Sequence, residues 1–219
     1  MDREGGLARL VAAGSPILKL RPPLQSLSRP FKIEPFNGGR LLRLTSADGM
    51  NRLTHSCMLA LTETVRELAS RDQPLIIAGN SNFFSVGADL NEISRLSGAE
   101  AYEFSKIGQT LMNEIEQFPA PVYAVVSGHC MGGGLDLALA CHRRIAAPTA
   151  LFGHRGAALG LVTGWGGTQR LPRLIGRARA LEMFVAAERI TAAQALRMGV
   201  VDVVCPLPEE QAIARLGIS

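Results

Sequence analysis

Two glycine-rich turns constrain this chain more than any other feature of its sequence. The first reads FSVGADL at residues 84–90, and the second reads GHCMGGGLD at residues 128–136. Each follows an apolar run suited to a buried strand, and the second opens onto a helical stretch at residues 135–140. Such turns leave backbone N–H groups without partners where a negatively charged oxygen can sit. Two such donors, brought together from separate turns, would form an oxyanion hole.

Strands and helices alternate along the whole sequence, which predicts an α/β fold. Apolar runs predict strands at residues 41–45, 75–79, 122–126, 145–147 and 201–204. Helical periodicity predicts helices at 55–70, 99–117 and 177–187, and another that ends at Gly199. Thr54 is a predicted N-cap, and two capping boxes are expected, Ser97 with Glu100 and Thr191 with Gln194.

The composition is that of a globular protein with one domain. Its 219 residues can bury a sizeable core, and 47% of them are apolar. No apolar run reaches the roughly 18–20 residues of a membrane span. The acidic and basic start, Asp2, Arg3 and Glu4, argues against a secretory signal. Four cysteines without a CxxC pair predict reduced, buried thiols in a cytoplasmic protein and no metal site.

The net charge of +4 comes mainly from arginine, with a cluster at Arg170, Arg173, Arg177 and Arg179. No aromatic side chains are interleaved with this cluster, and no nucleic-acid-binding module is recognisable, so we expect no nucleic acid partner. The remaining interpretations are a solvated helix face or a site for one phosphorylated ligand.

The chain divides into three parts. Residues 1–30 are interrupted by prolines and are expected to form a loosely ordered lead-in. Residues 31–205 contain the alternating strands and helices and form the predicted core. Residues 206–219 form a short C-terminal stub with an amphipathic stretch.

Each turn has a structural and a functional interpretation. Gly87 permits a tight turn that leaves the N–H of Ala88 free, and Asp89 can cap the segment that follows. The three glycines at 132–134 permit close approach of a ligand, although tight helix–strand packing explains them equally well. Neither GxGxxG, the P-loop pattern nor a GxSxG nucleophile elbow is present, which disfavours nucleotide binding and serine nucleophiles.

The chain resembles the enoyl-CoA hydratase/isomerase, or crotonase, family in three segments, at residues 83–93, 121–141 and 159–176. The likeness runs from about residue 40 to about residue 205. The resemblance implies a crotonase-like spiral of ββα units, assembly as a homotrimer or a dimer of trimers, and an acyl-CoA thioester substrate without a separate cofactor. The family normally continues with further helices beyond the end of this sequence.

The resemblance also assigns roles within the two turns. The N–H groups of Ala88 and Gly133 would hold the thioester carbonyl and stabilise an enolate, and the backbone near Val86 would contact the adenine end of CoA. The other predicted substrate-binding residues of the turns are Gly87, Asp89 and Gly132.

The two acid–base positions depart from the family pattern. Hydratases of the family carry two glutamates around one water. Asp136, which is shorter by one methylene, stands at the first position and is the predicted catalytic carboxylate. Gly156 stands at the second position, within FGHRG at residues 152–156. It cannot transfer a proton, and it is predicted only as a substrate-binding residue. Three nearby residues are conceivable substitutes: His154, Arg155 and His129.

These departures leave three functions open. The first is hydration or isomerisation of an acyl-CoA with Asp136 as the proton carrier. The second is another crotonase reaction that tolerates the loss of one glutamate, such as decarboxylation or thioester hydrolysis. The third is a catalytically silent paralogue that binds acyl-CoA or serves only in assembly.

Overall fold

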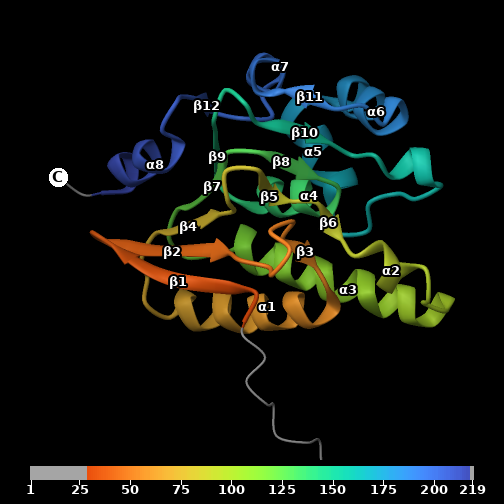
Figure 1. Cartoon of the computed structure of the whole chain (residues 1–219), viewed down its shortest axis with the longest axis horizontal. Coiled ribbons are helices and arrows are strands. Elements are labelled where there is room, and N and C mark those ends of the chain that lie inside the picture. The colour runs from red at the N-terminus through yellow and green to blue at the C-terminus, as the bar shows by residue number, and fades with distance from the viewer. Residues whose placement is uncertain (1–28, 218–219) are drawn as a thin grey trace, which may run out of the picture.

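The computed structural model describes residues 29–217 (Figure 1). The lead-in predicted at residues 1–30 therefore lies outside the described residues except for its last two. No helix in the described part of the chain is long and apolar enough to cross a membrane.

A six-stranded sheet runs through the molecule. Its order is β1 (Phe31–Phe36), β2 (Gly39–Leu44), β4 (Leu75–Ala78), β7 (Val122–Val126), β9 (Arg143–Ala146) and β12 (Val203–Val204). β1 and β2 form an antiparallel hairpin, and all the other neighbours pair in parallel. Parallel strands are covered on both faces, which explains why every residue of β4 is apolar and buried.

A second sheet lies beside the first. Its order is β11 (Ile190–Thr191), β10 (Leu151–Gly153), β8 (His129–Met131) and β5 (Phe83–Ser85). Each of three central strands of the first sheet is followed along the chain by a strand of the second sheet: β4 by β5, β7 by β8, and β9 by β10. β4, β7 and β9 are adjacent in this order in the first sheet, and β5, β8 and β10 are adjacent in the same order in the second. The chain therefore winds as a spiral that adds one strand to each sheet per turn. The predicted spiral of ββα units is confirmed.

A short parallel pair, β3 (Arg52–Leu53) and β6 (Gly87–Ala88), completes the strands of the described residues. The helices are α1 (His55–Ala69), α2 (Leu90–Ile93), α3 (Gly98–Glu116), α4 (Gly133–Ala140), α5 (Gly167–Ile175), α6 (Arg177–Ala186), α7 (Ala192–Met198) and α8 (Pro208–Leu216), with a 3-10 turn η1 at Gly156–Leu159. The long helices α1 and α3 pack against each other along one side of the sheets (Figure 1).

Local signals in the sequence set the helix starts. Thr54 accepts a hydrogen bond from the Cys57 N–H at the start of α1, as an N-cap does. Both predicted capping boxes are formed, at the starts of α3 and α7. The three capping predictions are therefore confirmed. Each cap depends only on contacts within one turn of helix, which is why the local sequence predicts it.

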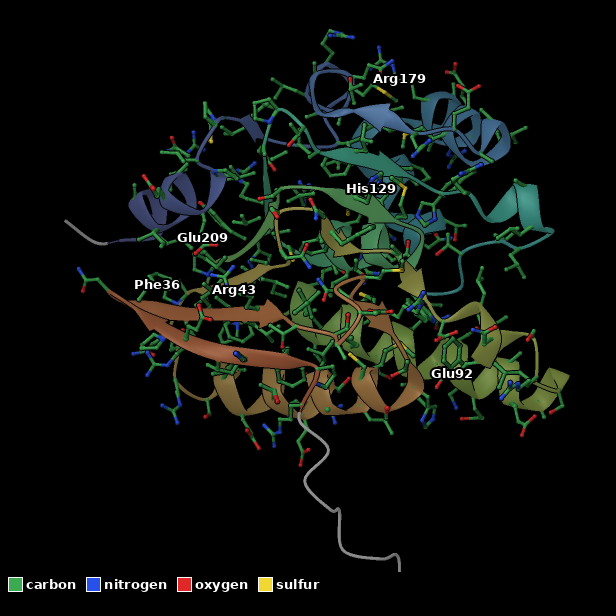
Figure 2. All side chains as sticks on the ribbon, viewed as in Figure 1. Phe36, Arg43, Glu92, His129, Arg179 and Glu209 are labelled. Atoms are coloured by element: carbon green, nitrogen blue, oxygen red, sulfur yellow. The ribbon has the colours of Figure 1, made fainter. Side chains whose placement is uncertain are left out.

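The C-terminal residues pack on the large sheet. α8, within the predicted stub 206–219, buries Ala212 and Leu216 against a second apolar cluster that includes Ile76 and Val125. An ion pair of 2.8 Å joins Glu209 of α8 to Arg43 of β2, and Figure 2 labels both. α8 thus covers the sheet face opposite the main core.

Asn51 connects the loop before α1 to the strand that carries the first glycine turn. Its side chain is buried and donates to the carbonyl oxygens of Phe83 at 3.0 Å and Phe84 at 3.1 Å. The Asn51 Oδ1 accepts from the Ser46 N–H at 3.1 Å. Asn51 also has a φ of 54°, a left-handed conformation that asparagine tolerates better than most residues.

We predict that Asn51→Ala lowers the free energy of unfolding by about 1–3 kcal/mol, because the Phe84 oxygen loses a buried donor and two part-buried hydrogen bonds, to the Phe83 oxygen and from the Ser46 N–H, are lost with it. Chemical denaturation measures this change. Asn82→Ala is the matched control, since Asn82 is exposed, and should change stability by less than about 0.5 kcal/mol. Equal effects of the two substitutions would contradict the role assigned to Asn51.

Candidate functional site

The structure brings the two glycine-rich turns into direct contact. Gly87 has a φ of 87°, and a Cβ added to it would lie 2.6 Å from the Gly133 nitrogen and 2.8 Å from the Met131 oxygen. A Cβ on Gly134 would lie 2.8 Å from the Ser85 Cβ. Only glycine at these positions lets the two backbones approach so closely. The predicted donors Ala88 and Gly133 therefore stand next to this shared contact.

The second turn leaves the N-terminus of α4 open. Gly132 adopts φ 53° and ψ −123°, and its N–H donates to the Gly153 oxygen at 2.9 Å. No side chain caps α4, and within residues 29–217 the Gly133 N–H has no backbone acceptor. Gly133 and Ala88 are both half-buried. The positive end of the helix is thus available to an anionic oxygen.

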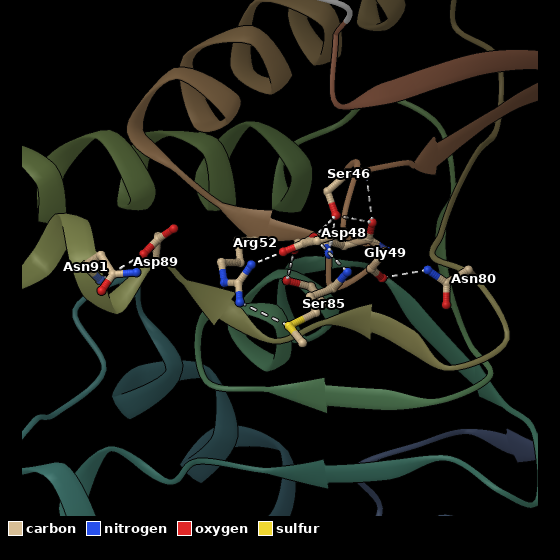
Figure 3. A network of polar contacts seen from close by, with 10 residues as sticks. Ser46, Asp48, Gly49, Arg52, Asn80, Ser85, Asp89 and Asn91 are labelled. Carbon is tan, nitrogen blue, oxygen red and sulfur yellow. Dashed lines mark hydrogen bonds and ion pairs between the residues drawn. The ribbon is translucent and has the colours of Figure 1, made fainter.

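Polar contacts hold the first turn in place. The Ser85 hydroxyl donates to the Asn51 oxygen at 2.7 Å and accepts from the Gly87 N–H at 3.0 Å. The Val86 N–H donates to the Met50 oxygen at 3.1 Å. Ser85 meets the loop of residues 46–52 from β5 (Figure 3). These bonds fix the backbone on which Ala88 depends.

Asp89 has a structural partner. Its carboxylate accepts a hydrogen bond of 2.8 Å from the Asn91 N–H and caps α2, as the sequence predicts (Figure 3). Its predicted role in binding substrate stays a prediction.

Asp136 is the buried carboxylate of the site. It lies on α4, one turn after Gly133, with 1% of its surface exposed. Thr163 donates a hydrogen bond to its Oδ2. The His154 Nε2 lies 3.0 Å from its Oδ1, but the two groups are not aligned as a hydrogen bond, so both atoms lack a hydrogen-bond partner among the described residues.

The structure distinguishes the three conceivable substitutes for the second glutamate. His154 is 4% exposed and touches Asp136. Arg155, next along the chain, is exposed to solvent. The His129 ring stacks on Phe83 with 5.4 Å between the ring centroids, and Figure 2 labels it. Only His154 is brought to the carboxylate.

Gly156 lies at the start of η1, where a side chain has no space. A Cβ there would lie 2.7 Å from the Leu161 oxygen. The Gly156 oxygen also accepts from the Leu161 N–H at 2.9 Å, which closes the loop on itself. The glycine is therefore required by the path of this loop.

Two residues of the site escaped the sequence analysis. Thr163 contacts Asp136, and Trp165 packs against the Cα of Gly133. Both lie in the segment 159–176, whose likeness to the family indicated membership but not these contacts. Gly167, in the same segment, leaves room for the carboxylate, since a Cβ there would overlap the Asp136 Oδ1.

The structure shows which cysteines are buried and where the clustered arginines lie. Cys57, Cys130 and Cys141 are free and buried, whereas Cys205 is half-buried. Burial, and then the nearby Cys141 and Asp136, raise the pKa of the Cys130 thiol well above its ordinary value, so it is no nucleophile. Arg170 forms an ion pair of 2.6 Å with Glu116, and the other three clustered arginines are exposed, as Figure 2 shows for Arg179.

Comparison with known proteins gives one consistent family. The sequence model of the enoyl-CoA hydratase/isomerase family matches residues 40–216. A probable enoyl-CoA hydratase of Bacillus subtilis (strain 168) is 46% identical over 130 residues, which are 59% of this chain and 50% of the relative. The match therefore spans half the length of that protein.

Two solved structures are similar over most of the chain. An enoyl-CoA hydratase of Bacillus anthracis has 33% identity and a TM-score of 0.81, covering 85% of this chain and 75% of that one. Pseudomonas aeruginosa DspI has 30% identity and a TM-score of 0.82, covering 86% and 79%.

We predict that Gly156→Ala lowers the free energy of unfolding by about 1–3 kcal/mol, because the added methyl group meets a backbone oxygen. Gly98→Ala is the control, since a Cβ there has no neighbour within 4 Å, and should be neutral or stabilising by up to about 1 kcal/mol. Thermal or chemical denaturation compares the two. If Gly156→Ala is as stable as the wild type, the loop can yield and a second carboxylate could be introduced there.

Proposed function

Because the chain belongs to the enoyl-CoA hydratase/isomerase family, we propose that it binds an acyl-CoA thioester and hydrates or isomerises its acyl group. One observation carries the proposal. The Gly87–Gly133 contact brings the two turns together beside the Gly133 N–H, which has no backbone acceptor among residues 29–217, and a buried carboxylate lies one helical turn away.

The Ala88 and Gly133 N–H groups are the proposed donors to the thioester oxygen. In the transition state, negative charge moves onto this oxygen, and each donor then contributes about 3 kcal/mol of stabilisation. The open end of α4 adds its positive partial charge at the same place. Fixed backbone donors need no reorganisation as the charge develops.

Asp136 is the proposed proton carrier. In hydration, the water oxygen bonds to Cβ while its proton passes to Asp136, and the electron pair of the double bond moves toward the thioester oxygen. The proton then returns from Asp136 to Cα, so that the net change is addition of one water. In isomerisation, the same carboxylate removes a proton from one carbon of the chain and returns it to another.

His154 and Thr163 are the proposed positioning residues for Asp136. The shorter aspartate must be held accurately, and contacts to both of its oxygens restrict its rotation. A carboxylate buried beside a histidine favours proton transfer over decarboxylation, since a decarboxylating substrate forms its own enolate and its carboxylate would be repelled by Asp136.

The proposal also covers the cofactor, the assembly and the location of the protein. CoA is part of the substrate, and we propose no separate cofactor. Within residues 29–217, no group of three or more His, Cys, Asp or Glu side chains is arranged to hold a metal ion. From the family likeness we further propose a cytoplasmic homotrimer or dimer of trimers that does not bind nucleic acid.

We predict that Asp136→Asn lowers turnover of crotonyl-CoA by about 10²–10⁴-fold, because the amide has the same shape but cannot accept a proton. Loss of the absorbance of the conjugated thioester measures turnover. Glu182→Gln, on the exposed face of α6, is the matched control and should leave turnover unchanged. Unchanged turnover in Asp136→Asn would remove Asp136 from the mechanism, and an inactive wild type would contradict the proposed function.

We predict that His154→Gln lowers kcat by about 10- to 100-fold and changes KM little, because a misplaced carboxylate slows proton transfer without weakening thioester binding. His129→Gln is the matched control, since His129 stacks on Phe83 and does not contact Asp136. Steady-state kinetics on the same substrate separate the two parameters. Equal loss in both variants, or a loss confined to KM, would contradict the positioning role.

A further inference from the structure

Trp165 fills the gap between α3 and the N-terminus of α4. It is the one tryptophan of the chain, and 4% of its surface is exposed. A Cβ added to Gly108 of α3 would overlap the five-membered ring, and a Cβ added to Gly133 of α4 would overlap the six-membered ring. Phe104, one turn before Gly108, packs on the indole with 5.5 Å between the ring centroids. Two glycines on separate helices thus make room for a single side chain.

The indole lies at the end of α4 where the proposed donor lies. In an α-helix the Cα–Cβ bond tilts toward the N-terminus, and the N–H groups of the first turn point the same way. The six-membered ring of Trp165 lies where a Cβ of Gly133 would be, so it lies beside the Gly133 N–H. An acyl chain leaving a thioester carbonyl held by that N–H meets the indole if it turns toward α3.

We infer that Trp165 closes the gap between α3 and α4 to a long acyl chain and limits the substrate to thioesters of short acyl groups. The inference rests on the proposed function, since it places the thioester carbonyl at Gly133. A cavity of about 430 Å³ opens nearby between α3 and α5, but the polar side chains of Gln109, Asn113, Glu116 and Arg170 line it. It does not suit an alkyl chain.

The test compares two saturated thioesters, butyryl-CoA and octanoyl-CoA, by isothermal titration calorimetry. The wild type should bind butyryl-CoA at least about 10-fold more tightly than octanoyl-CoA. Trp165→Ala opens the gap, and each methylene that then becomes buried should improve affinity by about 4-fold. In this variant octanoyl-CoA should bind at least as tightly as butyryl-CoA.

Two further variants separate this role from a purely structural one. Trp165→Phe keeps an aromatic ring against Phe104 and should weaken the preference for butyryl-CoA without abolishing it. Phe31→Ala removes a buried aromatic side chain from β1, away from α4, and should keep the wild-type preference. A loss of stability alone does not alter the ratio of the two affinities.

The outcomes distinguish the inference from the proposed function. Equal affinity of the wild type for the two thioesters, or an unchanged ratio in both Trp165 variants, overturns the inference while acyl-CoA binding stands. A shifted ratio without turnover of crotonyl-CoA supports the inference and contradicts the proposed catalysis. If the wild type binds neither thioester, both proposals are overturned.

Discussion

The rest of the site depends on one backbone contact, the approach of Gly87 to the Gly133 nitrogen. A Cβ at residue 87 would lie 2.6 Å from that atom, so any other residue would push β6 away from α4. The left-handed φ of Gly87 adds a second requirement that side chains meet poorly. The contact joins segments from two successive turns of the spiral. The positions of the proposed donors and the packing of the core are therefore set by the same pair of glycines.

Burial of the Asp136 side chain is an electrostatic cost of this arrangement. A carboxylate without water must be compensated by hydrogen bonds or by charge. Thr163 satisfies one oxygen, and the other faces His154 without an aligned bond. The proposed proton transfer requires such an oxygen, because a carboxylate bound on all sides would have no free lone pair.

Features that depend on nearby residues could be predicted from the sequence. The capping residues Thr54, Ser97 and Thr191 act within one turn, and the starts of α1, α3 and α7 follow from them. The spiral followed from the family likeness. The three-residue strands β5, β8 and β10 could not be bounded, since so few residues carry no periodicity. The contact of His154 with Asp136 joins distant segments, and only the folded chain decides between His154, Arg155 and His129.

One short segment, residues 163–167, contacts both the proposed proton carrier and the N-terminus of α4. Thr163 bonds the proposed proton carrier, Trp165 covers the end of α4, and Gly167 leaves space for the carboxylate. Any shift of this segment moves all three contacts together. The position of the proposed proton carrier and the space proposed for the acyl chain are thus coupled. A substitution that enlarges the space by moving the backbone would also displace Asp136, whereas one that only shortens the Trp165 side chain would not.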